Sequence, residues 1–156
     1  MRTCASLWIF HGVIAGFNYS HLVYSILPLL LLSPWIAVSD IRNRRIPNRA
    51  LLVLWILIEI VNVSRVEPGE LVPHTRAFLT FAIGSFFYGA TRGAIGMGDI
   101  KLFAILNLSL SNWQDSLLAL TYACFIGLIW AILTRRSQIA FGPPLLMGSF
   151  LLLISR

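Results

Sequence analysis

Two aspartates in an otherwise apolar chain are the residues with the clearest chemical potential. Asp99 directly follows Gly96-Met97-Gly98, and Asp40 lies in the stretch SDIRNRRIPN. Ionisable groups at membrane depth are costly and usually mark function. Two close carboxylates tend to share one proton, because both cannot ionise easily. The ionised member can then take a proton from water, while the protonated member polarises a carbonyl. We therefore predict that Asp40 and Asp99 form a catalytic acid–base pair.

Each aspartate, taken alone, also has a purely structural explanation. Asp99 follows a glycine-rich turn and is a good helix N-cap, because its carboxylate can accept hydrogen bonds from the first free N–H groups. Gly96 and Gly98 would then only permit the turn, since glycine tolerates positive φ. Asp40 would belong to a solvated basic loop, with Pro47 opening the next helix. These explanations weaken when both carboxylates fall at the same membrane depth.

Composition indicates an integral membrane protein. Of the 156 residues, 58% are hydrophobic and 12% are charged, and the mean hydropathy is +0.82. A soluble domain of this length has too little interior to hide so much apolar surface. Basic clusters beside apolar spans predict cytoplasmic loops, so a nucleic-acid partner is not expected. The cysteines and histidines show no disulfide or metal-ligand spacing, so we expect no metal site.

The apolar segments predict an all-α fold, a polytopic transmembrane bundle of about six helices. A helix needs about 20 apolar residues to cross a bilayer, and shorter ones are expected beside polar cavities. We expect residues 22–156 to form one domain, and residues 1–21 to add an N-terminal hydrophobic segment, either interfacial or a marginal span. The expected spans are Leu22–Ser39, Ala50–Ser64, Arg76–Thr91, Ile100–Leu110, Ser116–Thr134 and Ile139–Ile154.

The positive-inside rule sets the orientation of this bundle. Placing Asp40–Arg49 in the cytoplasm brings most Lys and Arg residues, including Arg135 and Arg136, to the inner face. The loop RVEPGELVPH (residues 65–74) then falls outside. Asp40 and Asp99 come to lie at the inner ends of their helices, at similar depth. The sequence thus predicts a multi-pass protein of the inner (cytoplasmic) membrane, surrounded by lipid.

Three motifs, taken together, resemble the type IV prepilin peptidase family. The stretch GMGD, ending at Asp99, resembles the GxGD motif of membrane aspartyl proteases. Asp40 followed by Arg45-Ile46-Pro47-Asn48 resembles the D-x4-(K/R)-IPN signature, and Phe141-Gly142-Pro143 is similar to the FGP element of the last helix. The motifs occur in the family's order, and the resemblance covers roughly residues 22–154. Ala140 stands where many members have proline.

The resemblance implies an aspartyl endopeptidase that removes a short basic leader from a prepilin-like substrate at the cytoplasmic membrane face. It implies Asp40 and Asp99 as the catalytic residues, with water and no cofactor. The chain shows no paired CxxC motifs and no methyltransferase region, so it resembles the compact form of tight-adherence (Flp-type) or archaeal systems. The motif residues around the aspartates are expected to bind substrate: Gly96, Gly98, Pro47, Asn48, Phe141, Gly142 and Pro143.

The residues alone leave a non-enzymatic alternative open. A small transporter or membrane assembly subunit would use the two aspartates as proton or cation sites. The sequence sets neither an oligomeric state nor which aspartate is the base. Lys101 should point to a different helix face from Asp99. Glu59 lies within LLVLWILIEIVNV and is expected to face a polar cavity or a partner helix.

Overall fold

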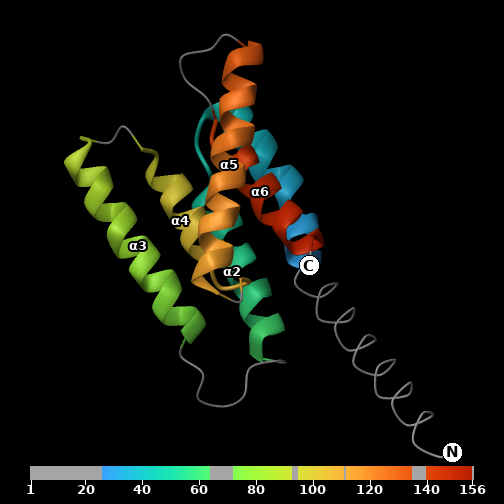
Figure 1. Cartoon of the computed structure of the whole chain (residues 1–156). Coiled ribbons are helices and arrows are strands. Elements are labelled where there is room, and N and C mark those ends of the chain that lie inside the picture. Colours follow the sequence, from blue (N-terminus) through green and yellow to red (C-terminus); the bar gives the residue numbers. More distant parts are fainter. Residues whose placement is uncertain (1–25, 64–71, 93–94, 111, 135–139, 156) are drawn as a thin grey trace, which may run out of the picture.

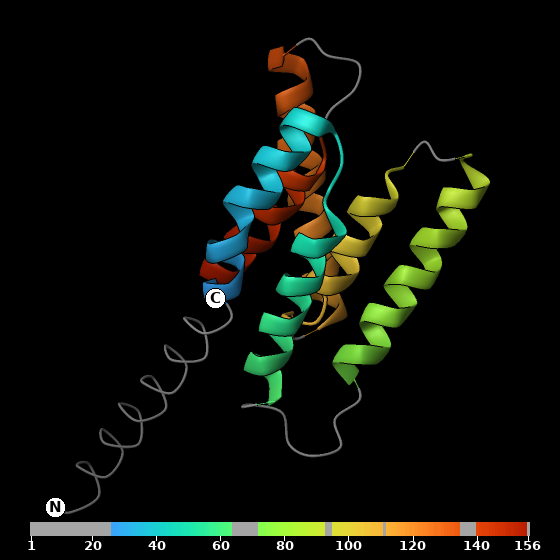
Figure 2. The same ribbon diagram turned by 180° about the vertical axis from the view of Figure 1, so that it is seen from behind.

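The computed structural model describes residues 26–63, 72–92, 95–110, 112–134 and 140–155 (Figures 1 and 2). All regular structure within these ranges is helical, which confirms the predicted all-α class for this part of the chain. The predicted segment 1–21 and the basic pair at 135 and 136 lie outside the described residues. The helices are residues 26–43, α2 (Asn48–Val63), α3 (Val72–Ala90), α4 (Met97–Leu106), α5 (Trp113–Thr134) and α6 (Gly142–Ile154).

The first described helix ends sharply, and this end creates the connection that carries the IPN motif. Arg44 has a φ of 50°, and its N–H donates to the Asp40 carbonyl at 2.8 Å. A residue in this left-handed conformation is a common way to stop a helix. Pro47 lies just before α2, and its carbonyl accepts hydrogen bonds from the N–H groups of Ala50 and Leu51. A short linker of residues 44–47 therefore joins the two helices and follows Asp40 closely.

The short helix α4 is the centre of the bundle. It contacts α2, α3 and α6, whereas α5 packs mainly against α6. Figures 1 and 2 show α3 at one edge, beside α4. The α4 side chains Leu102 and Leu106 are fully buried, as are Leu54 of α2 and Ile36 of the first helix. With ten residues, α4 is about 15 Å long, which is half of a typical hydrocarbon core.

The outer surface of the bundle is strongly apolar. Large side chains such as Phe78, Ile132 and Leu133 are 69%, 68% and 77% exposed. Among the described residues, one helix, α5, is both long and apolar enough to cross a membrane, and α6 is apolar but shorter. Monomeric soluble proteins rarely expose contiguous apolar patches of this extent.

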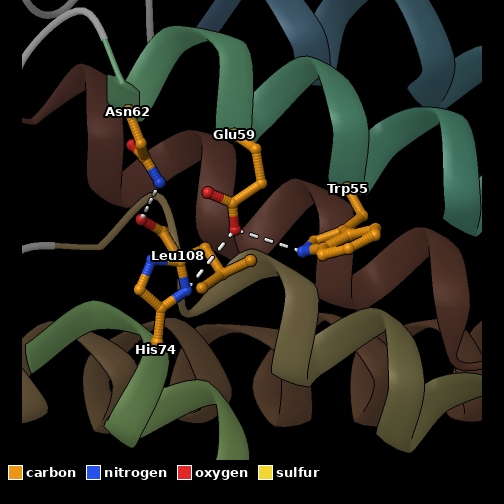
Figure 3. Close-up of polar contacts among 5 residues, drawn as sticks. All are labelled: Trp55, Glu59, Asn62, His74 and Leu108. Atoms are coloured by element: carbon orange, nitrogen blue, oxygen red, sulfur yellow. Dashed lines mark hydrogen bonds and ion pairs between the residues drawn. The ribbon is translucent and has the colours of Figure 1, made fainter. Parts of the chain in front are cut away.

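Polar contacts about three turns along α2 from Asn48 tie this helix to its neighbours (Figure 3). The Trp55 indole donates to Glu59 Oε1 at 3.1 Å, and His74 Nδ1 of α3 lies 3.5 Å from the same oxygen. Asn62 donates from its side chain to the Leu108 carbonyl at 3.2 Å. Glu59 therefore faces a partner helix, one of the two positions expected for it.

Candidate active site

Asp40 lies in the last turn of the first helix and is held by the start of α6. Its side chain is only 5% exposed, and its Oδ2 accepts a hydrogen bond from the Gly142 N–H at 2.9 Å, across 102 residues of sequence. Gly142 is the first residue of α6, whose own N-cap, Phe141, makes no side-chain capping bond. The first N–H groups of a helix have no partner within it. Asp40 therefore caps α6 from a distant part of the chain.

Asp99 is the third residue of α4 and does not cap it. The N-cap is Gly96, with φ −67° and ψ 127° and no side-chain capping bond. The structural explanation of Asp99 as an N-cap is therefore wrong. The carboxylate is half-buried and lies back over Gly96, where an added Cβ would come within 2.7 Å of Asp99 Oδ2. Gly96 thus leaves room for the Asp99 side chain.

Ile46 joins the surroundings of the two aspartates. A Cβ on Gly98, next to Asp99, would lie 3.2 Å from Ile46 Cβ. A Cβ on Gly142, which donates to Asp40, would lie 3.3 Å from Ile46 Cδ1. All three sequence motifs therefore meet at this side chain. Sequence reasoning missed Ile46, although one apolar residue in the polar stretch RNRRIPN is a usable signal.

The GMGD glycines do not use the positive φ that glycine tolerates in a turn. Gly96 has extended backbone with negative φ, and Gly98 is the second residue of α4. The space in front of Gly98 is occupied by Ile46, within 3.2 Å of a would-be Cβ. These glycines are thus explained by close approach of neighbouring side chains and not by an unusual turn.

The other predicted site residues divide into two groups. Asn48 starts α2, directly after Pro47, and its Oδ1 accepts a hydrogen bond from Lys101 Nζ at 3.3 Å. This contact links the beginnings of α2 and α4 beside the aspartates. The Phe141 ring instead packs on α5, 3.3 Å from a would-be Cβ on Gly127. Pro143 is half-exposed in the first turn of α6, where proline is well tolerated.

Burial controls the protonation of both aspartates, which lie just outside the predicted spans 22–39 and 100–110. Burial and, as the smaller cause, the nearby Asp40 charge together raise the pKa of Asp99 to about 7. Burial also raises the pKa of Asp40, while the hydrogen bond from Gly142 lowers it. The α4 N-terminus favours an ionised Asp99, but burial and the like charge outweigh it. The pair therefore tends to hold one proton near neutral pH, favoured on Asp99.

Comparison with known proteins places this site in a wider context. The profile of the type IV leader peptidase family matches residues 25–132, a range that contains Asp40 and Asp99 and ends before Phe141. The chain is 29% identical over 128 residues to the prepilin leader peptidase/N-methyltransferase of Bacillus subtilis (strain 168), covering 74% of this chain and 49% of that protein.

A second relative gives a similar result. The chain is 30% identical over 142 residues to the type 4 prepilin-like proteins leader peptide-processing enzyme of Escherichia coli O78:H11 (strain H10407), covering 78% of this chain and 49% of that protein. The chain thus spans about half the length of these curated relatives. No solved structure matches it significantly.

Proposed function

Because the chain belongs to the type IV leader peptidase family, we propose that it is a membrane aspartyl endopeptidase that removes the leader from prepilin-like proteins. The observation that carries this proposal is the convergence of three distant motifs on Asp40 and Asp99. One carboxylate is held by a backbone N–H, and the other has a pKa of about 7 because of burial and its neighbour's charge. This difference suits an acid–base pair at neutral pH.

The two aspartates take different roles in the proposed reaction. Asp40, whose ionised form is favoured by the hydrogen bond from the Gly142 N–H, removes a proton from a water molecule, whose oxygen attacks the carbonyl carbon of the scissile bond. Asp99 donates its proton to the carbonyl oxygen as the tetrahedral intermediate forms. When the C–N bond breaks, the leaving nitrogen takes the proton from Asp40, and Asp99 recovers its own. The reaction consumes water and needs no cofactor.

We place the protein in the inner (cytoplasmic) membrane as a multi-pass bundle, with both aspartates at the cytoplasmic face. The apolar outer surface and the span-length helix α5 support membrane insertion. The half-length α4 carries Asp99 in its first turn, which suits a site at a membrane edge that water can reach. Residues 22–156 would act as one domain, with Gly96, Gly98, Pro47, Asn48, Gly142, Pro143 and Phe141 forming or supporting the walls of the site.

Cleavage by purified protein in lipid nanodiscs, without an ion gradient, tests this function. The wild type should cut a prepilin-like precursor at the leader junction, whereas Asp40→Asn and Asp99→Asn should not, because each change removes an acid–base group but keeps its shape. Asp115→Asn is the control for removing a buried carboxylate elsewhere, because this α5 residue is also 5% exposed; its folding is checked by melting, because Asp115 interacts with the buried Arg76. A wild type that never cuts, or an Asp40→Asn variant that cuts normally, would favour the transporter or assembly alternative.

A further inference from the structure

An apolar groove lies between α2, α3 and α4 and begins beside the aspartate site. It has a volume of about 420 Å³. Its apolar walls include Leu52 and Trp55 of α2, Phe81 of α3 and Ile105 of α4. Clefts of this size fall within the range that bind ligands. The catalytic proposal does not use this groove, so its occupant needs a separate explanation.

The polar lining of the groove is confined to one end. Asn48 and Lys101 line it and are hydrogen-bonded to each other at 3.3 Å. Asn48 follows Ile46-Pro47, and Lys101 lies two residues after Asp99, so this end adjoins the site. Trp55 lies about two helical turns, or roughly 10 Å, further along α2. Beyond it, Glu59 and His74 join α2 to α3 (Figure 3).

The chemistry of the walls favours a helix over an extended strand as the form that a bound polypeptide takes. In lipid, a polypeptide must satisfy its backbone hydrogen bonds internally, because apolar side chains offer no donors or acceptors. An extended strand along Leu52 and Phe81 would leave its peptide groups unpaired. An apolar helix leaves no peptide group unpaired there, because its backbone hydrogen bonds are internal. Helices that bind in grooves use apolar side chains of this kind as anchors. Next to a bond being cut, the helix must unwind, and its freed carbonyls can accept hydrogen bonds from Lys101.

We propose that this groove docks about two turns of an apolar helix in the substrate, directly adjoining the cleaved bond. The inference rests on the proposed function, and it adds a separate recognition surface that aligns the bond with Asp40 and Asp99. Asn48 and Lys101 contact the unwound end of that helix, while Leu52, Trp55 and Phe81 contact its apolar side. The groove thereby selects precursors by the helix next to the leader.

Photo-crosslinking locates the helix independently of cleavage. A photoreactive phenylalanine replaces Leu52 in an Asp40→Asn background, and the probe is a synthetic precursor that carries a prepilin-type junction beside a 20-residue Leu/Ala helix. Leu128 of α5 is the matched control position, because it is 57% exposed and Leu52 is 56% exposed. We expect crosslinks to the precursor from position 52 and not from 128. Lipid-only crosslinks at 52, or equal yields at both positions, would overturn the proposal.

Kinetics then separate docking from chemistry. Leu52→Trp fills the groove, and Leu128→Trp makes the same change on a distant apolar surface. The kcat/KM ratio of the helix-bearing precursor to a precursor without the helix should fall at least tenfold for Leu52→Trp, which corresponds to about 1.4 kcal/mol. The ratio should stay unchanged for Leu128→Trp. An unchanged ratio for Leu52→Trp would refute the docking role, whereas a wild type that cuts neither precursor would refute the proposed function.

Discussion

Replacing Asp99 by asparagine should stabilise the folded protein at alkaline pH while abolishing the proposed peptide cleavage. Burial and the Asp40 charge raise the pKa of Asp99 from 3.8 to about 7. The folded state therefore prefers the protonated carboxyl, and ionising it inside the fold costs free energy. Asparagine keeps the shape and carries no charge at any pH. The variant should avoid a cost that the wild type incurs when its carboxyl must ionise.

The size and pH window of the effect follow from this shift. A pKa that moves from 3.8 to about 7 corresponds at most to about 4 kcal/mol, since each unit is about 1.36 kcal/mol. Water reaches the half-buried carboxylate, so we expect about 1–3 kcal/mol. The stability from the protonated carboxyl is fully present below pH 3.8 and is lost as pH rises through about 7. The advantage of the variant should therefore grow across that window and then stay constant.

Melting curves in detergent, followed by tryptophan fluorescence from pH 4 to pH 8.5, measure this difference. A gain of 1–3 kcal/mol corresponds to roughly 3–10 °C in Tm at alkaline pH for a protein of this size. In an Asp40→Asn background the gain should shrink, because the Asp40 charge is gone, but it should persist, because burial is the larger cause. A Tm difference that is the same at every pH, or a variant that melts earlier at pH 8.5, would refute this account of the site.

Three further predictions concern the same site. Cleavage should decline as pH rises through about 7, because Asp99 then loses the proton it donates; a rate that keeps rising to pH 9 would exclude Asp99 as the acid. Asp40→Ala should lower stability by about 1–3 kcal/mol, because it leaves the Gly142 N–H without its acceptor, whereas Asp40→Asn should cost less in the same melt, and equal losses would argue against the cap. Gly98→Ala should slow cleavage by pushing on Ile46, whose Cβ would lie 3.2 Å from the new Cβ, and adding Ile46→Ala, which removes Cγ1 and Cδ1 at 3.5 and 3.7 Å and lets the smaller side chain shift, should restore part of the rate; a pair with no recovery would show that the two residues do not act together.

The helices were predictable because their signals are local. Apolar runs predicted spans such as 50–64 and 116–134, and the structure has α2 at Asn48–Val63 and α5 at Trp113–Thr134. The bounds of α4 were less accurate. Glycine is a poor helix former, so the predicted span starts at Ile100 with Asp99 as its cap, whereas Met97, Gly98 and Asp99 already belong to the helix. At the other end, the backbone N–H and the side chain of Asn107 both donate to the Phe103 carbonyl, at 3.1 and 2.8 Å, and α4 ends at Leu106, short of the predicted Leu110.

The site was only partly predictable, because its contacts join distant parts of the chain. The predicted placement of Asp40 and Asp99 at similar membrane depth indicated a carboxylate pair, since charged groups are rare in such apolar surroundings. No local pattern indicates that the Gly142 N–H donates to Asp40 across 102 residues. The contacts of Ile46 are equally non-local, because its neighbours Gly98 and Gly142 come from two other helices.

The glycines explain why three motifs act as one unit. A Cβ on Gly96 would meet the Asp99 carboxylate, one on Gly98 would meet Ile46, and one on Gly142 would lie 2.7 Å from Asp40 Oδ2. Each glycine thus makes room for a protein side chain. A larger residue at any of these glycines would displace an aspartate or Ile46. Because protein side chains already fill the space in front of these glycines, the motif surfaces have little freedom to adapt to different substrates. We infer that the motifs fix the chemistry, and that selection among precursors depends on surfaces beside them, such as the groove lined by Leu52.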